Sequence, residues 1–348
     1  MTTGADPHLN AKAVNLALQG GGAHGAFVWG VLEEFLDDGR LSIEAISATS
    51  AGAMNAVVLA YGLTLGGREA AREKLAEFWR EVAEAVRQIR LAWFPLDGLV
   101  GACGLPPDYY PSYISLHAAM QMFPAYAFNP LALNPLKDVL LKVVDFAKLN
   151  SPPHATRLFL NATNVRTGKI KVFETPAITV DAVLASACLP PYFQAIEIDG
   201  EYYWDGGYMG NPAIFPLIYR QGSKDVIVIH VNPIQRDEPP RTSAEIMHRI
   251  NEISFNSSLM REMRAVAFMT RLIDQHELDE KRYNRVFIHW VGNDRLMAQL
   301  GTASQFYADW DRLSHLRSEG RHSARQWLEE NFEHVGRRST VDLTRMFL

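Results

Sequence analysis

Three short stretches of the 348-residue chain contain residue types that could perform acyl transfer. Residues 16–27, LALQGGGAHGAF, place four glycines where backbone N–H groups could approach a negative charge closely. Ser50 stands among small residues in SATSAGAMNA, and Asp205 precedes two glycines in YYWDGGYMG. A serine hydroxyl is a weak nucleophile at neutral pH unless a base accepts its proton. Ser50 and Asp205 are therefore the candidate nucleophile and base.

The glycine loop has a second interpretation, as a dinucleotide-binding turn. Gly20, Gly22 and Gly25 fit the spacing G-x-G-x-x-G. That function needs an acid at the carboxyl end of the next strand to hold a ribose, whereas Glu44 lies near the beginning of that strand. A P-loop is excluded because no Lys-Ser or Lys-Thr pair follows the glycines. Taken alone, the loop could also be a turn that only lets strand and helix pack closely.

Ser50 lies where an expected strand turns into an expected helix, as in a nucleophile elbow. In such an elbow the residues two before and two after the serine must be small. Gly52 meets this requirement, whereas Ala48 adds one methyl group where glycine is usual. A lone serine in such a run is more often a helix N-cap or a packing residue. If the two strand ends are adjacent, N–H groups from both loops converge before Ser50 as an oxyanion hole: Gly20, Gly21, Gly22 and Ala51.

Asp205 is the strongest candidate for the base. It follows a short expected strand, and Gly206 and Gly207 allow the backbone to turn tightly there. The same tripeptide could be only a turn. A Ser-acid-His triad is the alternative, because His230 and His289 both follow Asp205 near expected strands. We prefer the dyad, since neither histidine has a convincing loop position.

The stretches GGGAHG, ATSAG and DGG, in this order and spacing, resemble the motifs of the patatin-like phospholipase family. Those motifs are G-G-G-x-[RK]-G, G-x-S-x-G and D-G-[GA], and the resemblance covers roughly residues 14–235. It implies a modified α/β hydrolase fold in which Ser50 is the nucleophile and Asp205 the base. It also implies fatty acyl esters of phospholipids or lysophospholipids as substrates, no catalytic histidine, and neither a metal ion nor a cofactor for the chemistry.

Two positions depart from the family pattern. His24 replaces the usual Arg or Lys, and a neutral imidazole would supply no positive charge near pH 7. Ala48 replaces glycine, and because alanine is the least disruptive replacement we expect only a slight change in the strain of the elbow. The residues expected to support the site are those that shape its loops: His24, Gly25, Gly52, Gly206 and Gly207.

The elements expected around these motifs alternate between strand and helix, which is typical of a three-layer α/β fold with a mainly parallel sheet. Strands are expected at 14–18, 41–48, 157–164, 169–174, 225–231 and 285–291, with two short ones around 199–200. Helices are expected from 27, from 51 to about 61, and at 68–88, 135–149 and 180–188. We divide the chain into a tail at 1–13, a catalytic domain at 14–235 and a mainly helical extension at 236–348.

Residues 91–136 form a distinct apolar segment inside the catalytic domain. The segment has no Lys or Arg, its only acids are Asp97 and Asp108, and prolines and aromatic residues are frequent. Prolines break regular elements, so we expect a compact insertion or lid made of short helices. Most of it should pack as a plain buried insertion, with a few side chains bordering an acyl-chain pocket: Trp93, Phe94, Tyr109 and Tyr110.

Composition and charge limit the other functions. The net charge is −5, which gives no general attraction to nucleic acid. Cys103 and Cys188 cannot form a disulfide framework or a recognisable metal site. No signal peptide or membrane-spanning run is present, so a cytoplasmic location is expected, with peripheral membrane contact and oligomeric state left open. Four arginines of an expected long helix should form a solvated face, the alternatives being lipid headgroups or an oligomer interface: Arg249, Arg261, Arg264 and Arg271.

A serine acyl-ester hydrolase acting on lipids is therefore the leading prediction. A lipid- or partner-binding protein on the same scaffold is the alternative, because two motif positions have changed. A nucleotide-binding oxidoreductase is third.

Overall fold

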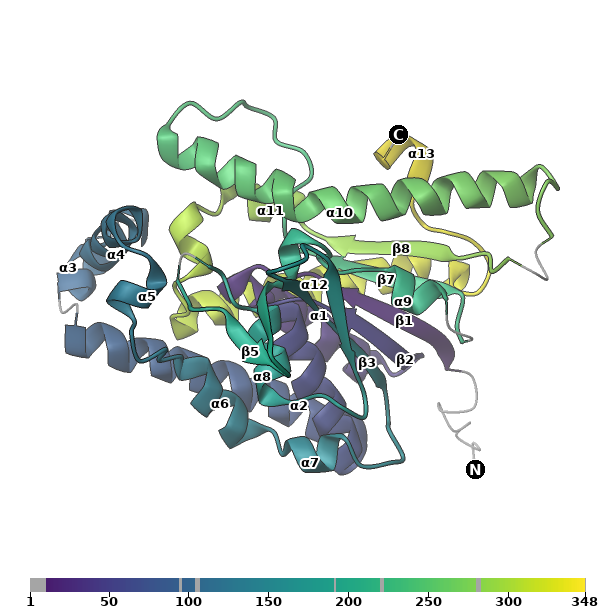
Figure 1. Ribbon diagram of the computed structural model, residues 1–348. Helices are drawn as coiled ribbons and strands as arrows, with labels where there is room; N and C mark the ends of the chain where they lie inside the picture. Colours follow the sequence, from purple (N-terminus) through teal and green to yellow (C-terminus); the bar gives the residue numbers. More distant parts are fainter. Residues whose placement is uncertain are drawn as a thin grey trace.

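The computed structural model describes residues 11–93, 96–103, 107–190, 192–219, 222–279 and 283–347. It confirms the α/β class: one mainly parallel sheet has helices on both faces (Figure 1). The strand order is β5-β6-β3-β2-β1-β7-β8, and β4 pairs with β3. The strands are β1 Lys12–Leu18, β2 Leu41–Ala48, β3 Arg157–Asn164, β4 Ile170–Glu174, β5 Ile196–Ile198, β6 Glu201–Asp205, β7 Asp225–His230 and β8 Phe287–Gly292.

The register of the central strands brings two loops together. β1 pairs in parallel with β2 and β7, and β2 pairs in parallel with β3. Leu18, the last residue of β1, lies opposite Ala48, the last residue of β2. The glycine loop and Ser50 therefore follow adjacent strand ends at the same edge of the sheet. This adjacency is the condition on which the predicted oxyanion hole depends.

Apolar faces of the helices cover the sheet on each side. One side carries α1 Gly25–Asp38, α2 Ala51–Trp93 and α12 Trp310–Asn331, and the other α9 Phe215–Ile218, α10 Ser243–Asp274 and α13 Leu343–Phe347. The chain departs from helical geometry at Gly66 and Gly67 within α2, which explains why the sequence predicts two helices there. None of the described helices combines the length and the apolar composition that crossing a bilayer requires.

The remaining helices are short. They comprise α3 Leu96–Ala102, α4 Pro111–Met122, α5 Ala125–Phe128, α6 Pro135–Val143, α7 Phe146–Leu149, α8 Val180–Ser186 and α11 Asp294–Gln299. Single 3-10 turns are η2 Gly22–His24, η3 Pro107–Tyr109, η4 Gly206–Tyr208, η5 Thr302–Gln305 and η6 Phe332–His334. The apolar insertion consists of short helices, as predicted. The prediction of a single helix at 135–149 is wrong, because the structure has two helices there, α6 and α7. Val144 between them is extended, and the Asp145 side chain caps α7 by accepting the N–H groups of Ala147 and Lys148.

The segment after residue 236 joins the same sheet and core. β8 pairs in parallel with β7, and α12 packs along α1. The two helices approach so closely that a Cβ on Gly320 would collide with the carbonyl oxygen of Phe27. Ion pairs between Glu33 and Arg317 and between Glu34 and Arg325 flank this contact. At the other end of the chain, β1 begins at Lys12, inside the stretch expected to be a tail, and residues 1–10 lie outside the described part.

Candidate active site

Ser50 occupies a sharp turn between β2 and α2. Its φ of 56° lies in the left-handed region, which a serine adopts only under constraint. Gly52 permits this turn, because a Cβ there would collide with the carbonyl oxygen of Leu18. The Ser50 N–H donates to Ser186 Oγ at 2.9 Å, so the end of α8 supports the turn. Ala48 is fully buried in the core, and its methyl group is accommodated.

Asp205 faces Ser50 across the end of β3. Ala48 lies opposite Leu160 on one side of β3, and Asp205 lies opposite Ala162 two residues further along. The Ser50 hydroxyl lies near enough to the Asp205 carboxylate to lower the pKa of that carboxyl as a hydrogen-bond donor. The same carboxylate accepts the N–H of Gly207 at 2.7 Å through Oδ1, so the D-G-G turn orients it. The sheet therefore places the two residues predicted as nucleophile and base close to each other.

Burial changes the proton affinity of Asp205. Its side chain is almost completely enclosed, with 2% of the residue exposed, and this raises the pKa of Asp205 to about 7. Hydrogen bonds from the Gly207 N–H and the Ser50 hydroxyl act in the opposite direction. Burial, followed by the nearby Asp205, raises the pKa of Cys188 and of Tyr208 to about 12, so both stay protonated near neutral pH.

The glycine loop lies against Ser50. A Cβ on Gly20 would lie 2.5 Å from the Cβ of Ser50, so only glycine allows this approach. The Gly20 N–H itself donates to Asn211 Oδ1 at 2.7 Å, and we therefore leave it out of the oxyanion hole. Within the described residues, no protein atom accepts the N–H groups of Gly21, Gly22 or Ala51. These three N–H groups are free to bind a negatively charged oxygen.

A network of buried amide side chains holds the glycine loop. Gln19 donates to the Asn211 carbonyl at 3.0 Å and accepts the N–H groups of Val231 and Asn232 at 3.0 and 3.1 Å. Asn232 in turn donates to the carbonyl oxygen of Gly20 at 2.7 Å, and Asn256 donates to that of Asn232 at 2.9 Å. No local sequence pattern predicts this network, because its residues come from four separate segments. The one local signal is Gln19, a polar residue after an apolar strand.

His24 is buried and neutral beside this loop. Its Nε2 lies 2.7 Å from Ser304 Oγ, and the Ser304 hydroxyl donates to the Gly301 carbonyl at 2.5 Å. Ser304 must then accept from the histidine, which places the proton on Nε2. Burial, with smaller contributions from His248 and Arg312, lowers the pKa of His24 to about 3. The position that is basic in the family motif thus carries no charge at neutral pH.

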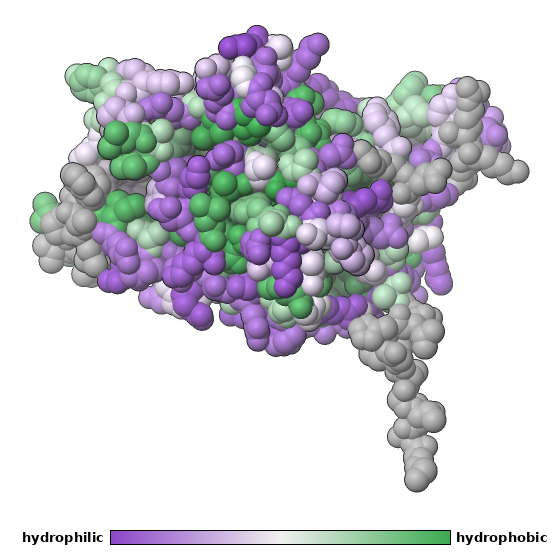
Figure 2. Space-filling view, turned by 60° about the horizontal axis from the view of Figure 1, so that its bottom comes forward, coloured by the Kyte–Doolittle hydropathy of each residue, from purple (hydrophilic) through white to green (hydrophobic). Residues whose placement is uncertain are grey.

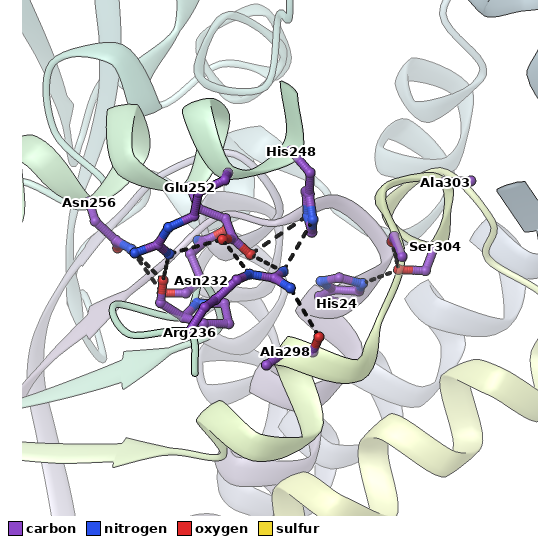
Figure 3. Close-up of polar contacts among 12 residues, drawn as sticks. His24, Asn232, Arg236, His248, Glu252, Asn256, Ala298, Ala303 and Ser304 are labelled. Carbon is purple, nitrogen blue, oxygen red and sulfur yellow. Dashed lines mark hydrogen bonds and ion pairs between the residues drawn. The ribbon is translucent and has the colours of Figure 1, made fainter. Parts of the chain in front are cut away.

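A charged cluster near His24 joins Arg236, which precedes α10, to the first half of that helix (Figure 3). Glu252 accepts Arg236 at 2.6 and 2.9 Å and Arg249 at 3.0 Å, and Arg236 Nη2 lies 3.2 Å from His248 Nδ1. Arg249 also donates to the carbonyl oxygen of Ile234 at 2.7 Å. The prediction of a solvated face is therefore wrong for Arg249, which turns inward to satisfy Glu252. The side chains of the second half are exposed as expected: Arg261, Arg264 and Arg271.

The histidines of the alternative triad and the acid of the alternative dinucleotide site have other partners. His230 Nδ1 lies 3.1 Å from Asp294, and His289 Nε2 lies 2.9 Å from Asp225. Neither forms a hydrogen bond with Ser50 or Asp205 among the contacts of the described residues. Glu44 accepts the N–H of Ser223 at 2.7 Å, toward the start of its strand, and so lacks the position of a ribose-binding acid.

The aromatic residues predicted to border a pocket are only partly placed. Tyr110 packs edge-on against Tyr307 with 5.0 Å between ring centroids, and Tyr109 is 60% exposed. The side chain of Trp93 and the whole of Phe94 lie outside the described residues. Tyr208 follows the D-G-G turn, and burial together with the nearby Asp205 raises the pKa of its hydroxyl. Its ring centroid lies 5.5 Å from that of Phe255.

Comparisons with known proteins agree with this architecture. Residues 16–218 match the patatin-like phospholipase family. A cGAMP-activated phospholipase of Vibrio cholerae is 26% identical over 235 residues, which is 60% of this chain and 57% of that protein. The chain therefore spans less than two thirds of that relative.

Two solved structures complete the comparison. VipD of Legionella pneumophila is 15% identical, with 92% of this chain and 67% of that chain covered and a TM-score of 0.42. The type III effector ExoU is 15% identical, with 91% and 53% covered and a TM-score of 0.33. Because the family match covers more than half of the sequence, including the glycine loop, Ser50 and Asp205, the chain belongs to the patatin-like phospholipase family.

Proposed function

We propose that this protein is a serine hydrolase that cleaves fatty acyl esters of phospholipids or lysophospholipids through Ser50 and Asp205. The observation that carries the proposal is that the Ser50 turn lies beside the buried Asp205 carboxylate at the ends of the two strands that flank β3, where the Ser50 hydroxyl acts on it as a hydrogen-bond donor. A base poised near neutral pH is suited to accept a proton from a weak nucleophile. Family membership supports the choice of a lipid ester as substrate.

The first half of the reaction forms an acyl-enzyme. Asp205 accepts the hydroxyl proton while Ser50 Oγ attacks the ester carbonyl carbon. The carbonyl oxygen becomes negative and binds the free N–H groups of Gly21, Gly22 and Ala51. When the carbon–oxygen bond of the ester breaks, Asp205 returns its proton to the leaving alcohol, and the acyl group stays on Ser50.

The second half releases the fatty acid. Asp205, again ionised, accepts a proton from a water molecule that attacks the acyl-enzyme carbonyl. The same N–H groups stabilise the second tetrahedral intermediate. Asp205 then protonates Ser50 Oγ as the acid leaves, which restores the starting state.

Hydrolysis of a chain-length series of nitrophenyl esters and of phosphatidylcholine tests this proposal. Ser50→Ala should lower kcat by about 10³-fold or more, and Asp205→Asn by about 10²-fold or more. His230→Gln is the control and should retain activity, because His230 bonds Asp294. If Ser50→Ala hydrolysed the esters as fast as the wild type, the proposal would be contradicted. A wild type that binds lipid but hydrolyses no ester would favour the alternative, a lipid-binding protein on the same scaffold.

A further inference from the structure

The first half of α10 presents an apolar face to the solvent. Ile246, Met247, Ile250 and Ile253 are each between 43% and 55% exposed. Residues three or four apart lie on the same side of a helix, and this spacing relates Ile246 to Ile250, Met247 to Ile250 and Ile250 to Ile253. A surface helix normally directs such a stripe toward the core.

Three polar residues of the same half of α10 are buried: His248, Glu252 and Asn256. Glu252 binds the side chains of Arg236 and Arg249 beneath the helix. The second half of α10 is conventional, since Leu259 and Met263 are buried there and the arginines are exposed. The inversion is thus confined to residues 246–256.

The apolar insertion adds a second exposed surface. Met122 is 74% exposed and Phe123 is 51% exposed at the end of α4. The two acids of the insertion do not offset this, because Asp97 is buried and Asp108 accepts the N–H of Ala303. With no Lys or Arg between 91 and 136, the insertion presents no cation to its surroundings.

Contacts connect the elements that carry both surfaces to the candidate active site. η5 contacts both η3, which precedes α4, and α10, and Ser304 of η5 bonds His24 of the glycine loop. Phe255 of α10 lies directly over Gly207, next to Asp205. Figure 1 shows α4 and the first half of α10 at the end of the molecule opposite the N-terminus. Figure 2 shows hydrophobic residues at this same left-hand end.

We propose that these two surfaces form an apolar rim that docks the protein on a lipid surface with Ser50 toward the lipid. The apolar rim comprises Ile246, Met247, Ile250, Ile253, Met122 and Phe123. This inference rests on the proposed function, because a long-chain ester must leave a bilayer or micelle to reach Ser50. The charge distribution favours an uncharged lipid surface: anionic membranes are recognised through clusters of Lys and Arg, which the insertion lacks.

Vesicle binding by the full chain tests the apolar rim. Ser50→Ala protein is mixed with large phosphatidylcholine vesicles, so that the lipid stays intact, and the bound fraction is measured by sedimentation. Binding should be equal at low and high salt, since apolar burial and not ion pairing provides it. Adding Ile246→Gln and Ile250→Gln should weaken partitioning by about tenfold or more.

Phe268→Gln is the matched control, because Phe268 is 50% exposed on the second half of the same helix and should not affect binding. When Ser50 is kept intact, the rim variants should hydrolyse soluble short-chain esters at the wild-type rate, which would show that they fold. Equal vesicle binding by rim and control variants would overturn the inference. So would a requirement for anionic lipid, or a dimer that the rim variants dissociate. Binding is measured without hydrolysis, so its outcome is separate from that of the proposed chemistry.

Discussion

The Asp205 carboxyl group is both enclosed and engaged by two hydrogen-bond donors. Enclosure disfavours its ionised form, and the donors favour it, which leaves its pKa at about 7. A base with this proton affinity accepts a proton more readily than an exposed aspartate does. The D-G-G turn thus affects the proton affinity of Asp205 as well as its position, because the Gly207 N–H lowers the pKa that burial raises.

The rate of ester cleavage should depend on the ionisation of Asp205. Protonated Asp205 cannot accept the Ser50 proton, so kcat/KM should fall about tenfold per pH unit below a midpoint near 7. A pH profile with a soluble ester measures this. A rate that is unchanged down to pH 5 would exclude Asp205 as the base.

The same burial should cost stability. Between its ordinary pKa of 3.8 and its folded value of about 7, Asp205 keeps its proton only in the folded chain, so stability falls as pH rises through this window. The cost above pH 7 is on the order of 4 kcal/mol. Asp205→Asn should therefore raise the thermal midpoint more at pH 8 than at pH 4. An equal change at both pH values would contradict this account.

His24 should not tolerate the basic residue that the family motif has at its position. The site is buried beside His248 and Arg312. Among the described residues the one acid that acts on His24 is Glu252, and Glu252 already binds two arginines. His24→Lys should lower the free energy of unfolding by about 3 kcal/mol or more. His24→Gln, which can still donate to Ser304, is the control, and urea denaturation measures both. Equal stability of the two variants would contradict this prediction.

At the scale of elements, the strand ends and turns of the site are local features, and the sequence predicts them well. β2 spans the expected residues 41–48, and the elbow follows at Ser50. Contacts between distant segments are not visible in this way, so the amide network around Gln19 was missed. A prediction from helical periodicity also takes the apolar face of a helix to be the buried one. This fails on α10 at Arg249, because the buried Glu252 forms ion pairs with Arg236 and Arg249 beneath the helix.

The elbow should depend on glycine at position 52 and not at position 48. Gly52→Ala places a methyl group against the Leu18 carbonyl oxygen and displaces Ser50, so kcat should fall by about 10²-fold. Ala48→Gly restores the family residue and should change kcat little. Steady-state kinetics with a short-chain ester compares the two variants. Equal effects would show that the elbow is not fixed by this contact.

At the scale of the whole molecule, the C-terminal segment packs into the same core and sheet as the rest of the chain. α12 buries Leu313 and Leu316 in the same core as α1 and α2, and β8 extends the sheet beyond β7. The sequence predicts a mainly helical extension with one strand, but helical periodicity alone does not show which surface α12 covers. The placement of this segment depends on contacts across nearly 300 residues, such as Arg317 with Glu33.

Leu316→Ala should therefore destabilise the catalytic core. Leu316 is fully buried, and the cavity should cost about 2–5 kcal/mol of unfolding free energy. Esterase activity and helical content should be lost together in a urea titration, at a lower midpoint than in the wild type. Activity that persists at the wild-type midpoint would show that the segment folds independently.

Covalent trapping of the nucleophile tests the central claim most directly. The protein is treated with a fluorophosphonate, which reacts with activated serines, and the labelled peptide is identified by mass spectrometry. The account predicts a single adduct on Ser50 that is absent in Ser50→Ala and forms more slowly in Asp205→Asn. An unlabelled Ser50, together with ester hydrolysis that persists in Ser50→Ala, would contradict it.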